Sequence, residues 1–317
     1  MTDQTTKTFR DASSASPLIV NFGGGVDSTA ILVRLAQLFQ AGDATARPDL
    51  VLFADVGAET PETYENVDRV SAWLVSQGLP PVTVVSRATA IKTRSPYVTI
   101  LENCIANETL PSEAFGFGSC SIKWKHEPMD RFLFGTKRKG GEDGWLARNG
   151  FAGQKPTKLI GYDATETCKG KRGSWAKVKE DAVAFMRYPL VEWSWTREIC
   201  QAEIAAAGLE VPPKSACFFC PNAKPAELEA LEENHPVLFL QALAVEENAR
   251  TGRHGLRKVE GLWRRTRKAD GRPGSWLAWA KQTGLLESAQ VRSGKSLPQV
   301  LAELRASVER RAQALAV

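Results

Sequence analysis

Short apolar runs alternate with longer helical patterns through the first part of the chain. The runs 18–22, 50–54 and 82–85 have the length and composition of buried strands. Segment 30–39 is apolar on nearly all sides, as expected of a helix packed on a parallel sheet, and Thr60 is expected to cap a second helix. This rhythm predicts an α/β fold with a doubly wound, mostly parallel sheet.

Farther along, one more strand is expected at 155–162, and the pattern becomes helical beyond Pro225. Segments 226–249 and 297–316 are amphipathic, and Pro236 is expected to divide the first into two helices because proline removes a helical hydrogen bond. The predicted organisation is a flexible N-terminal tail (1–16), an α/β domain (17–224) and a helical, basic C-terminal region (225–317).

Composition narrows the class of protein. The 317 residues are 43% hydrophobic and 24% charged, which suits a globular chain with a sizeable core. No apolar run approaches the roughly 18–20 residues that a membrane span needs, so no membrane partner is expected. The first 16 residues are polar and lack the apolar segment of a signal peptide, so we expect a cytoplasmic location. A net charge of +5 permits a nucleic-acid partner without requiring one.

The stretch 21–30, NFGGGVDSTA, lies between the first apolar run and the first helix. Its three glycines allow a tight turn, and Asp27 or Ser28 is expected to cap the helix that follows. A glycine-rich turn at a helix N-terminus presents backbone amides to an anion such as phosphate. An ordinary strand-to-helix turn is the alternative interpretation.

The order of residues in this stretch resembles the S-G-G-x-D-S loop of the PP-loop ATP pyrophosphatases. Gly24, Gly25, Asp27 and Ser28 match, and Gly23 stands in place of the leading serine. The resemblance implies that the loop binds the pyrophosphate end of ATP with Mg²⁺, that Asp27 lies nearest the metal, and that Asp27 and Ser28 are catalytic. The nucleotide-binding residues it implies here are Phe22, Gly23, Gly24, Gly25, Val26, Asp27 and Ser28.

Segment 53–63 resembles the F-x-D-T-G-x-x-x-P-E-T segment of the phosphoadenosine-phosphosulfate (PAPS) reductase branch of this superfamily. The matching residues are Asp55, Gly57, Pro61, Glu62 and Thr63. In that branch this strand end holds the adenosine half of the nucleotide, so the resemblance makes Asp55 and Gly57 nucleotide-site candidates. The alternative is that Asp55 only caps a turn.

Segment 161–170 is similar to the branch's G-[IV]-R-x-x-E-S-x-x-R, and Gly161 and Glu166 match as nucleotide-site candidates. Asp163 replaces the first arginine, and Gly170 falls where the second would be. Bidentate arginine contacts to phosphate or sulfate are not reproduced by a flexible lysine. The departures therefore indicate that the site does not hold the sulfated substrate of the reductases.

Six cysteines in a chain without an export signal are expected to be reduced thiols or ligands. Segment 120–129, CSIKWKHEPM, resembles the reductase signature C-C-x-x-x-K-x-x-P-[LM], with Ser121 in place of the second cysteine. With the C-x-x-C of Cys217 and Cys220, the resemblance implies a [4Fe-4S] cluster on Cys120, Cys217 and Cys220. A zinc site with a fourth ligand from His126, Cys168 or Cys104, and no metal at all, stay open as alternatives.

Segment 250–281 interleaves basic residues with Trp263, Trp276 and Trp279. Cations beside aromatic rings suit a nucleic-acid backbone with unstacked bases. The alternative is a solvated basic loop whose tryptophans pack into the core.

These features favour an ATP pyrophosphatase that adenylates an acceptor, expected to be a nucleic acid (tRNA or DNA), for sulfur transfer. The chain is similar to the ATP pyrophosphatase of DNA phosphorothioation systems, and a sulfur donor such as a cysteine desulfurase is the implied partner. One alternative is a sulfonucleotide reductase, whose nucleophilic C-terminal cysteine has no counterpart after Cys220. The other is a non-catalytic nucleotide-binding partner in a nucleic-acid-modifying complex. A homodimer stays open as the oligomeric state.

Overall fold

A computed structural model describes residues 16–87, 97–136, 142–165 and 183–314. The chain divides into two compact units. The first unit comprises 1–54, 60–85 and 129–215, and the second comprises 55–59, 86–128 and 216–317. Among the described residues, no helix combines the length and the apolar character that crossing a bilayer requires.

A five-stranded parallel sheet forms the centre of the first unit, in the order β3-β2-β1-β4-β5. The strands are β1 (Leu18–Phe22), β2 (Leu50–Asp55), β3 (Val82–Ser86), β4 (Thr157–Ile160) and β5 (Phe185–Arg187). The four expected strands are confirmed, although β4 is shorter than the segment 155–162. Because β1 pairs in parallel with both β2 and β4, the direction of winding reverses between β1 and β4. Ligands bind at such a reversal in open α/β sheets.

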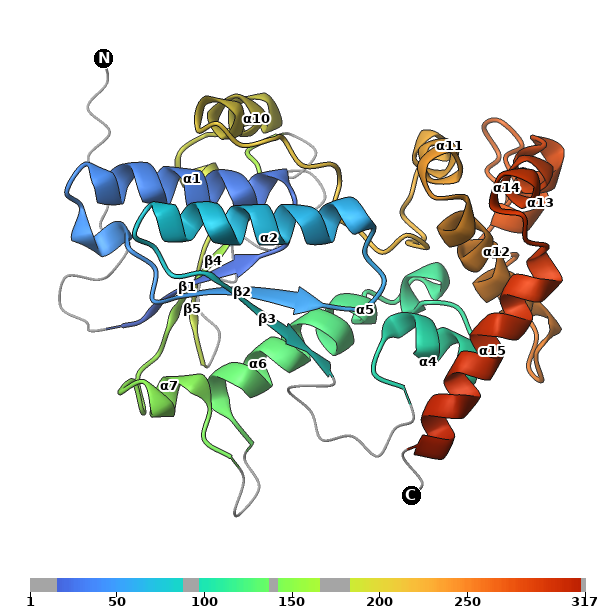
Figure 1. Ribbon diagram of the computed structural model, residues 1–317, viewed down its shortest axis with the longest axis horizontal. Coiled ribbons are helices and arrows are strands. Elements are labelled where there is room, and N and C mark those ends of the chain that lie inside the picture. The colour runs from blue at the N-terminus through green and yellow to red at the C-terminus, as the bar shows by residue number, and fades with distance from the viewer. Residues whose placement is uncertain (1–15, 88–96, 137–141, 166–182, 315–317) are drawn as a thin grey trace. The chain divides into compact units, whose positions relative to one another are not determined.

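Helices cover both faces of this sheet (Figure 1). On one face lie α1 (Val26–Gln40), α2 (Pro61–Ser76) and α10 (Arg197–Ala206), and on the other lie α6 (Glu127–Phe134) and α7 (Trp145–Arg148). Alternate strand residues supply the two cores. Val20 and Phe22 pack with α1, whereas Ile19 packs with Leu133 of α6. The α/β class is confirmed, and this arrangement is compatible with double winding.

The second unit is helical. Its main helices are α4 (Ile100–Ala106), α11 (Pro225–Asn234), α12 (Pro236–Thr251), α13 (Trp276–Gln282), α14 (Leu285–Ser293) and α15 (Leu297–Ala314). The expected break at Pro236 is confirmed, since it begins α12. α12 lies in the centre of the core, with Phe239, Leu240 and Leu243 fully buried. The C-terminal region 225–317 thus shares one core with segment 86–128.

The carboxyl group of Glu246 ties α12 to the segment that precedes α13. One of its oxygens accepts hydrogen bonds from the backbone amides of Leu262 (2.8 Å) and Trp276 (2.9 Å). The other accepts from the Leu277 amide (3.0 Å) and the Ser275 hydroxyl. Burial raises the pKa of Glu246 although these four donors lower it. The group is therefore a structural anchor whose bonds replace the water that burial removes.

Replacement of this anchor should destabilise the second unit. In Glu246→Gln one acceptor oxygen becomes an NH₂ group facing amide donors, so we expect a loss of roughly 1–3 kcal/mol in the free energy of unfolding. The matched control is Glu247→Gln, which removes the partner of the exposed Arg250 and should cost under about 1 kcal/mol. Urea unfolding followed by circular dichroism measures both, and equal losses would contradict the anchoring role.

Candidate functional site

The glycine loop joins β1 to α1, and Gly25, with an extended backbone, is the cap of the helix. Asp27 and Ser28 are therefore its second and third residues, and the prediction that one of them caps α1 is wrong. The Ser28 hydroxyl accepts a hydrogen bond from the Gly23 amide (3.0 Å) and donates one to the Gly25 carbonyl (3.2 Å). These bonds fold the loop onto the positive end of the helix dipole.

Two side chains from other parts of the first unit hold the carbonyl groups of the loop. Asn66 of α2 donates to the Gly24 carbonyl (2.9 Å), and Ser215 donates to the Gly23 carbonyl (2.6 Å). Gly24 has a φ of +75°, and a Cβ there would lie 3.1 Å from the Thr63 methyl group. The carbonyl oxygens of Gly23 and Gly24, which would repel an anion, thus accept hydrogen bonds from these side chains. The loop therefore suits an anion at the start of α1.

Two buried polar atoms of α2 lie in side chains that contact this loop. The Thr63 hydroxyl and the Asn66 amide oxygen have no hydrogen-bond partner among the described residues. Such atoms are rare in folded proteins, and a bound ligand or water would satisfy them. No sequence pattern points to Asn66, and Thr63 is indicated only by its match to the P-E-T segment.

Gly161 follows β4 and packs directly against the first turn of α1. A Cβ at Gly161 would lie 2.8 Å from the Ser28 amide nitrogen and 3.1 Å from the Asp27 Cβ. Only glycine allows this approach without moving backbone atoms. The structure therefore places Gly161 against Asp27 and Ser28 at the reversal between β1 and β4, and that these residues bind a nucleotide stays a prediction.

Three charged side chains meet beside the loop. Arg197, at the start of α10, donates to the Asp27 carboxylate at 2.8 Å. Burial raises the pKa of Asp27, Arg197 lowers it and the nearby Asp163 carboxylate raises it, for a net increase. Asp163 is itself buried and accepts hydrogen bonds from the Thr165 amide (3.0 Å) and hydroxyl (2.5 Å). The Asp163 carboxylate thus lies near that of Asp27, and the cation beside them is Arg197, which no motif in the sequence indicated.

This donor set fits Mg²⁺. Carboxylate oxygens are hard ligands, and Mg²⁺ is usually held by one or two carboxylates together with phosphate oxygens. Asp27 and Asp163 would supply the carboxylates, and an anion on the loop would supply the remainder. A carboxyl whose pKa is raised by burial and by a neighbouring carboxylate, as that of Asp27 is, is also typical of functional positions.

The other predicted nucleotide residues divide into two groups. The side chains of Phe22 and Val26 lie in the core, where the Phe22 ring packs at 6.2 Å from that of Phe53, so only their backbone faces the loop. Asp55 and Gly57 belong to the second unit, where the Gly57 amide donates to the Asp55 carboxylate at 2.7 Å. Asp55 therefore closes a turn, and its role as a nucleotide-binding residue stays a prediction. Glu166, Cys168 and Gly170 lie outside the described residues.

The three predicted metal ligands come from distant parts of the chain but share one neighbourhood in the second unit. Cys120 lies in α5 (Ser119–Ser121), and the Cys220 amide closes a turn on the Cys217 carbonyl at 2.9 Å. Burial raises the pKa of Cys217, and the charges of Glu59, Cys220 and Cys120 raise it further. In the described part of the chain no His, Cys, Asp or Glu residues form a ready-made metal-binding group of three or more.

A buried ion pair adjoins these thiols. The Glu59 carboxylate is fully buried and lies 3.2 Å from the Lys125 ammonium group. Burial alone would lower the pKa of Lys125, but Glu59 together with the thiols of Cys217 and Cys220 raises it overall. A cation held here offsets the negative charge of thiolates, and thiolates are the soft ligands that zinc and iron-sulfur clusters require.

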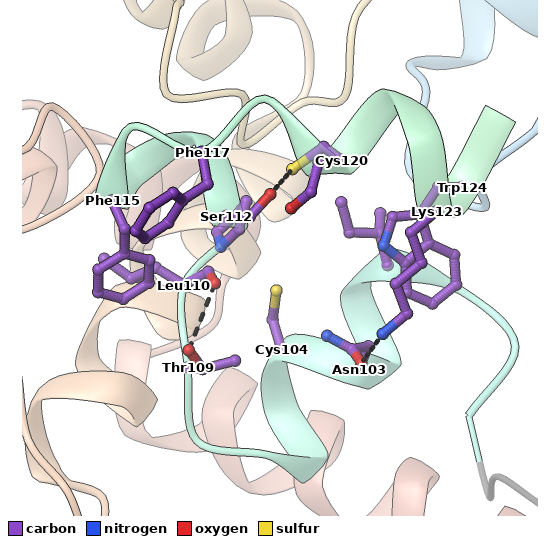
Figure 2. Close-up of a pocket in the computed structure, with 13 residues that line it drawn as sticks. Asn103, Cys104, Thr109, Leu110, Ser112, Phe115, Phe117, Cys120, Lys123 and Trp124 are labelled. Carbon is purple, nitrogen blue, oxygen red and sulfur yellow. Dashed lines mark hydrogen bonds between the residues drawn. The ribbon is translucent and has the colours of Figure 1, made fainter. Parts of the chain in front are cut away.

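Cys120 also lines a pocket of about 260 Å³ together with Cys104 (Figure 2). The Cys120 thiol is 3.0 Å from the Ser112 hydroxyl, and Cys104 is completely buried. Cys200 is fully buried in the core of the first unit, where desolvation raises its pKa to about 12. Comparisons with models of known protein families and with curated proteins found no match to this chain.

The raised pKa of Asp27 predicts a pH-dependent stability for the ligand-free protein. The folded state binds the proton of this carboxyl more tightly than the unfolded state, so the contribution of Asp27 to stability falls as pH rises above its ordinary pKa of 3.8. Relative to wild type, Asp27→Asn should therefore gain stability between about pH 4 and about pH 7. Asp270→Asn is the control with the opposite slope, because Arg267 lowers the pKa of Asp270. Urea midpoints across this range measure both slopes, and a flat or falling difference for Asp27→Asn would contradict the assignment.

Proposed function

We propose that the protein is an ATP pyrophosphatase of the PP-loop type that activates an acceptor for sulfur transfer. The observation that carries the proposal is the glycine loop at the start of α1, closed by Gly161 and flanked by the Asp27 and Asp163 carboxylates. In this proposal the loop offers a site for an anion, and the two carboxylates offer hard oxygen ligands for a metal ion. The pyrophosphate of ATP, which binds together with Mg²⁺, requires both.

The chemistry follows from this arrangement. Attack of an acceptor oxygen on the α-phosphorus forms an acceptor–AMP ester and breaks the bond to the β-phosphate. The released pyrophosphate remains on the loop, whose amides and helix dipole stabilise its charge. Mg²⁺ bound by Asp27 and Asp163 would supply further charge neutralisation. A sulfur nucleophile then displaces AMP from the acceptor.

Within this proposal Arg197 positions the Asp27 carboxylate. Its guanidinium lies 2.8 Å from Asp27, and its side chain is 37% exposed, so it can also meet an incoming phosphate. The cysteines of the second unit would hold a [4Fe-4S] cluster, with zinc as the alternative, for the sulfur step. We propose a nucleic acid, tRNA or DNA, as the acceptor.

Two other functions remain as alternatives. A sulfonucleotide reductase needs cations around its sulfated substrate, whereas Asp163 adds a negative charge beside Asp27. This observation disfavours the reductase, and release of sulfite from PAPS or adenosine phosphosulfate would restore it. A non-catalytic nucleotide-binding partner would use the same loop, and it would bind ATP without turnover.

Turnover of ATP tests the proposal directly. Purified protein with ATP, Mg²⁺, either tRNA or DNA, and sulfide as the sulfur nucleophile should release AMP and pyrophosphate in equal amounts. Asp27→Asn should lower that rate by about 100-fold, because it removes a charge from the pyrophosphate site. Asp43→Asn, which lies beyond the C-terminal end of α1, is the matched control and should keep the wild-type rate. ATP binding without AMP release would support the non-catalytic alternative instead.

Metal content tests the cysteine site. Protein purified without oxygen should be brown and contain iron, and Cys120→Ser should lose both properties because one thiolate ligand is removed. Cys200→Ala, in the core of the first unit, is the control and should retain the metal. Zinc in place of iron would select the zinc alternative, and a wild-type protein with neither metal would contradict the site.

A further inference from the structure

The pocket beside Cys120 has the chemistry of a site for a flat, polar ring. It is lined by the rings of Phe115, Phe117 and Trp124 and by the polar groups of Asn103, Ser112 and Lys123 (Figure 2). Its volume of about 260 Å³ is at the small end of ligand pockets, which excludes a large ligand. Aromatic walls with a few polar groups are what a nucleobase needs for stacking and hydrogen bonding.

The rim of the pocket is exposed and aromatic. The Phe117 side chain is 68% exposed and lines the pocket, so its ring is accessible to a ligand. The neighbouring Gly116 has a φ of +86°. The Arg264 guanidinium packs directly against the Gly116 backbone, since a Cβ at Gly116 would lie 1.3 Å from Arg264 Nη2. A cation from a distant segment thus borders the aromatic rim.

Arg264 belongs to a strongly basic segment, defined here as residues 253–272. This basic segment contains eight lysine and arginine residues and two acidic ones, so its net charge exceeds the +5 of the whole chain. Arg265 and Lys268 are exposed, and Arg272 is fixed by its guanidinium, which stacks 4.0 Å from the Trp263 ring. Glu246 anchors the same segment through Leu262. The segment therefore presents its cations from a fixed frame, as binding to a phosphate backbone requires.

We propose that this pocket receives one unstacked nucleobase of a single-stranded nucleic acid whose phosphate backbone lies on the basic segment. The base stacks on Phe117, and Asn103 and Lys123 provide polar contacts to its edge. A base in a duplex is paired and stacked, so it has to leave the helix to enter. The inference deepens the proposed function and rests on its nucleic-acid acceptor, because a base held here lies beside the predicted metal ligand Cys120.

Fluorescence anisotropy without ATP tests this inference. The probes are fluorescein-labelled single strands of about twelve nucleotides, one DNA and one RNA, and the DNA duplex of the same sequence. Wild type should bind at least one single strand more tightly than the duplex. Phe117→Ala should weaken single-strand binding about tenfold by removing a stacking surface, whereas Val291→Ala, equally apolar and 82% exposed on α14, should not.

The basic segment has its own variant. Arg265→Ala combined with Lys268→Ala should weaken binding of single strand and duplex alike and reduce the dependence of the dissociation constant on salt. Equal affinity of Phe117→Ala and wild type for the single strands, or equal affinity of wild type for strand and duplex, would overturn the inference. So would full displacement of the strand by free AMP at comparable concentration. Because ATP is absent, Asp27→Asn should bind the strand as wild type does. Strand binding thus tests the nucleobase site independently of ATP turnover, so failure of the proposed function is distinguishable from failure of this inference.

Discussion

The first unit depends on how closely the end of β4 approaches the start of α1. A side chain on Gly161 would collide with the backbone of Ser28, so any other residue would separate the strand from the helix. With that contact made, the reversal of winding between β1 and β4 places the glycine loop and Asp163 at one edge of the sheet. The positions of the glycine loop and of the two neighbouring carboxylates both depend on this single backbone contact.

The partners of two buried carboxylates in the second unit distinguish a structural carboxylate from one that lies among reactive groups. Glu246 is met by backbone amides and a hydroxyl, groups that cannot change charge, so its role is to hold a segment in place. Glu59 is met by Lys125 beside the thiols of Cys217 and Cys220, groups that do change charge. An unpaired buried charge costs several kcal/mol. The fold therefore has to supply hydrogen-bond or ionic partners to both carboxylates.

The tryptophans and the cations of segment 250–281 lie in different surroundings. The Trp263 ring packs against those of Trp276 and Trp279, with centroids 5.6 Å and 5.4 Å away. All three tryptophans are buried. The prediction that these tryptophans stack on bases is therefore wrong, and the alternative of core packing is confirmed. The cations of the basic segment other than Arg272 are exposed, and the ring that we propose for stacking is the exposed Phe117, which the sequence did not single out.

The sequence by itself determined the features that depend on neighbouring residues. Apolar runs predicted the strands, Pro236 predicted a helix break, and the glycines predicted the loop, because strand formation, proline geometry and glycine freedom are local properties. Tertiary structure alone decided which groups meet. Arg197 and Asp27 lie 170 positions apart, and Cys120 joins Cys217 only through the core of the second unit. Burial and pairing of charges depend on the packing of distant segments, which no local pattern encodes.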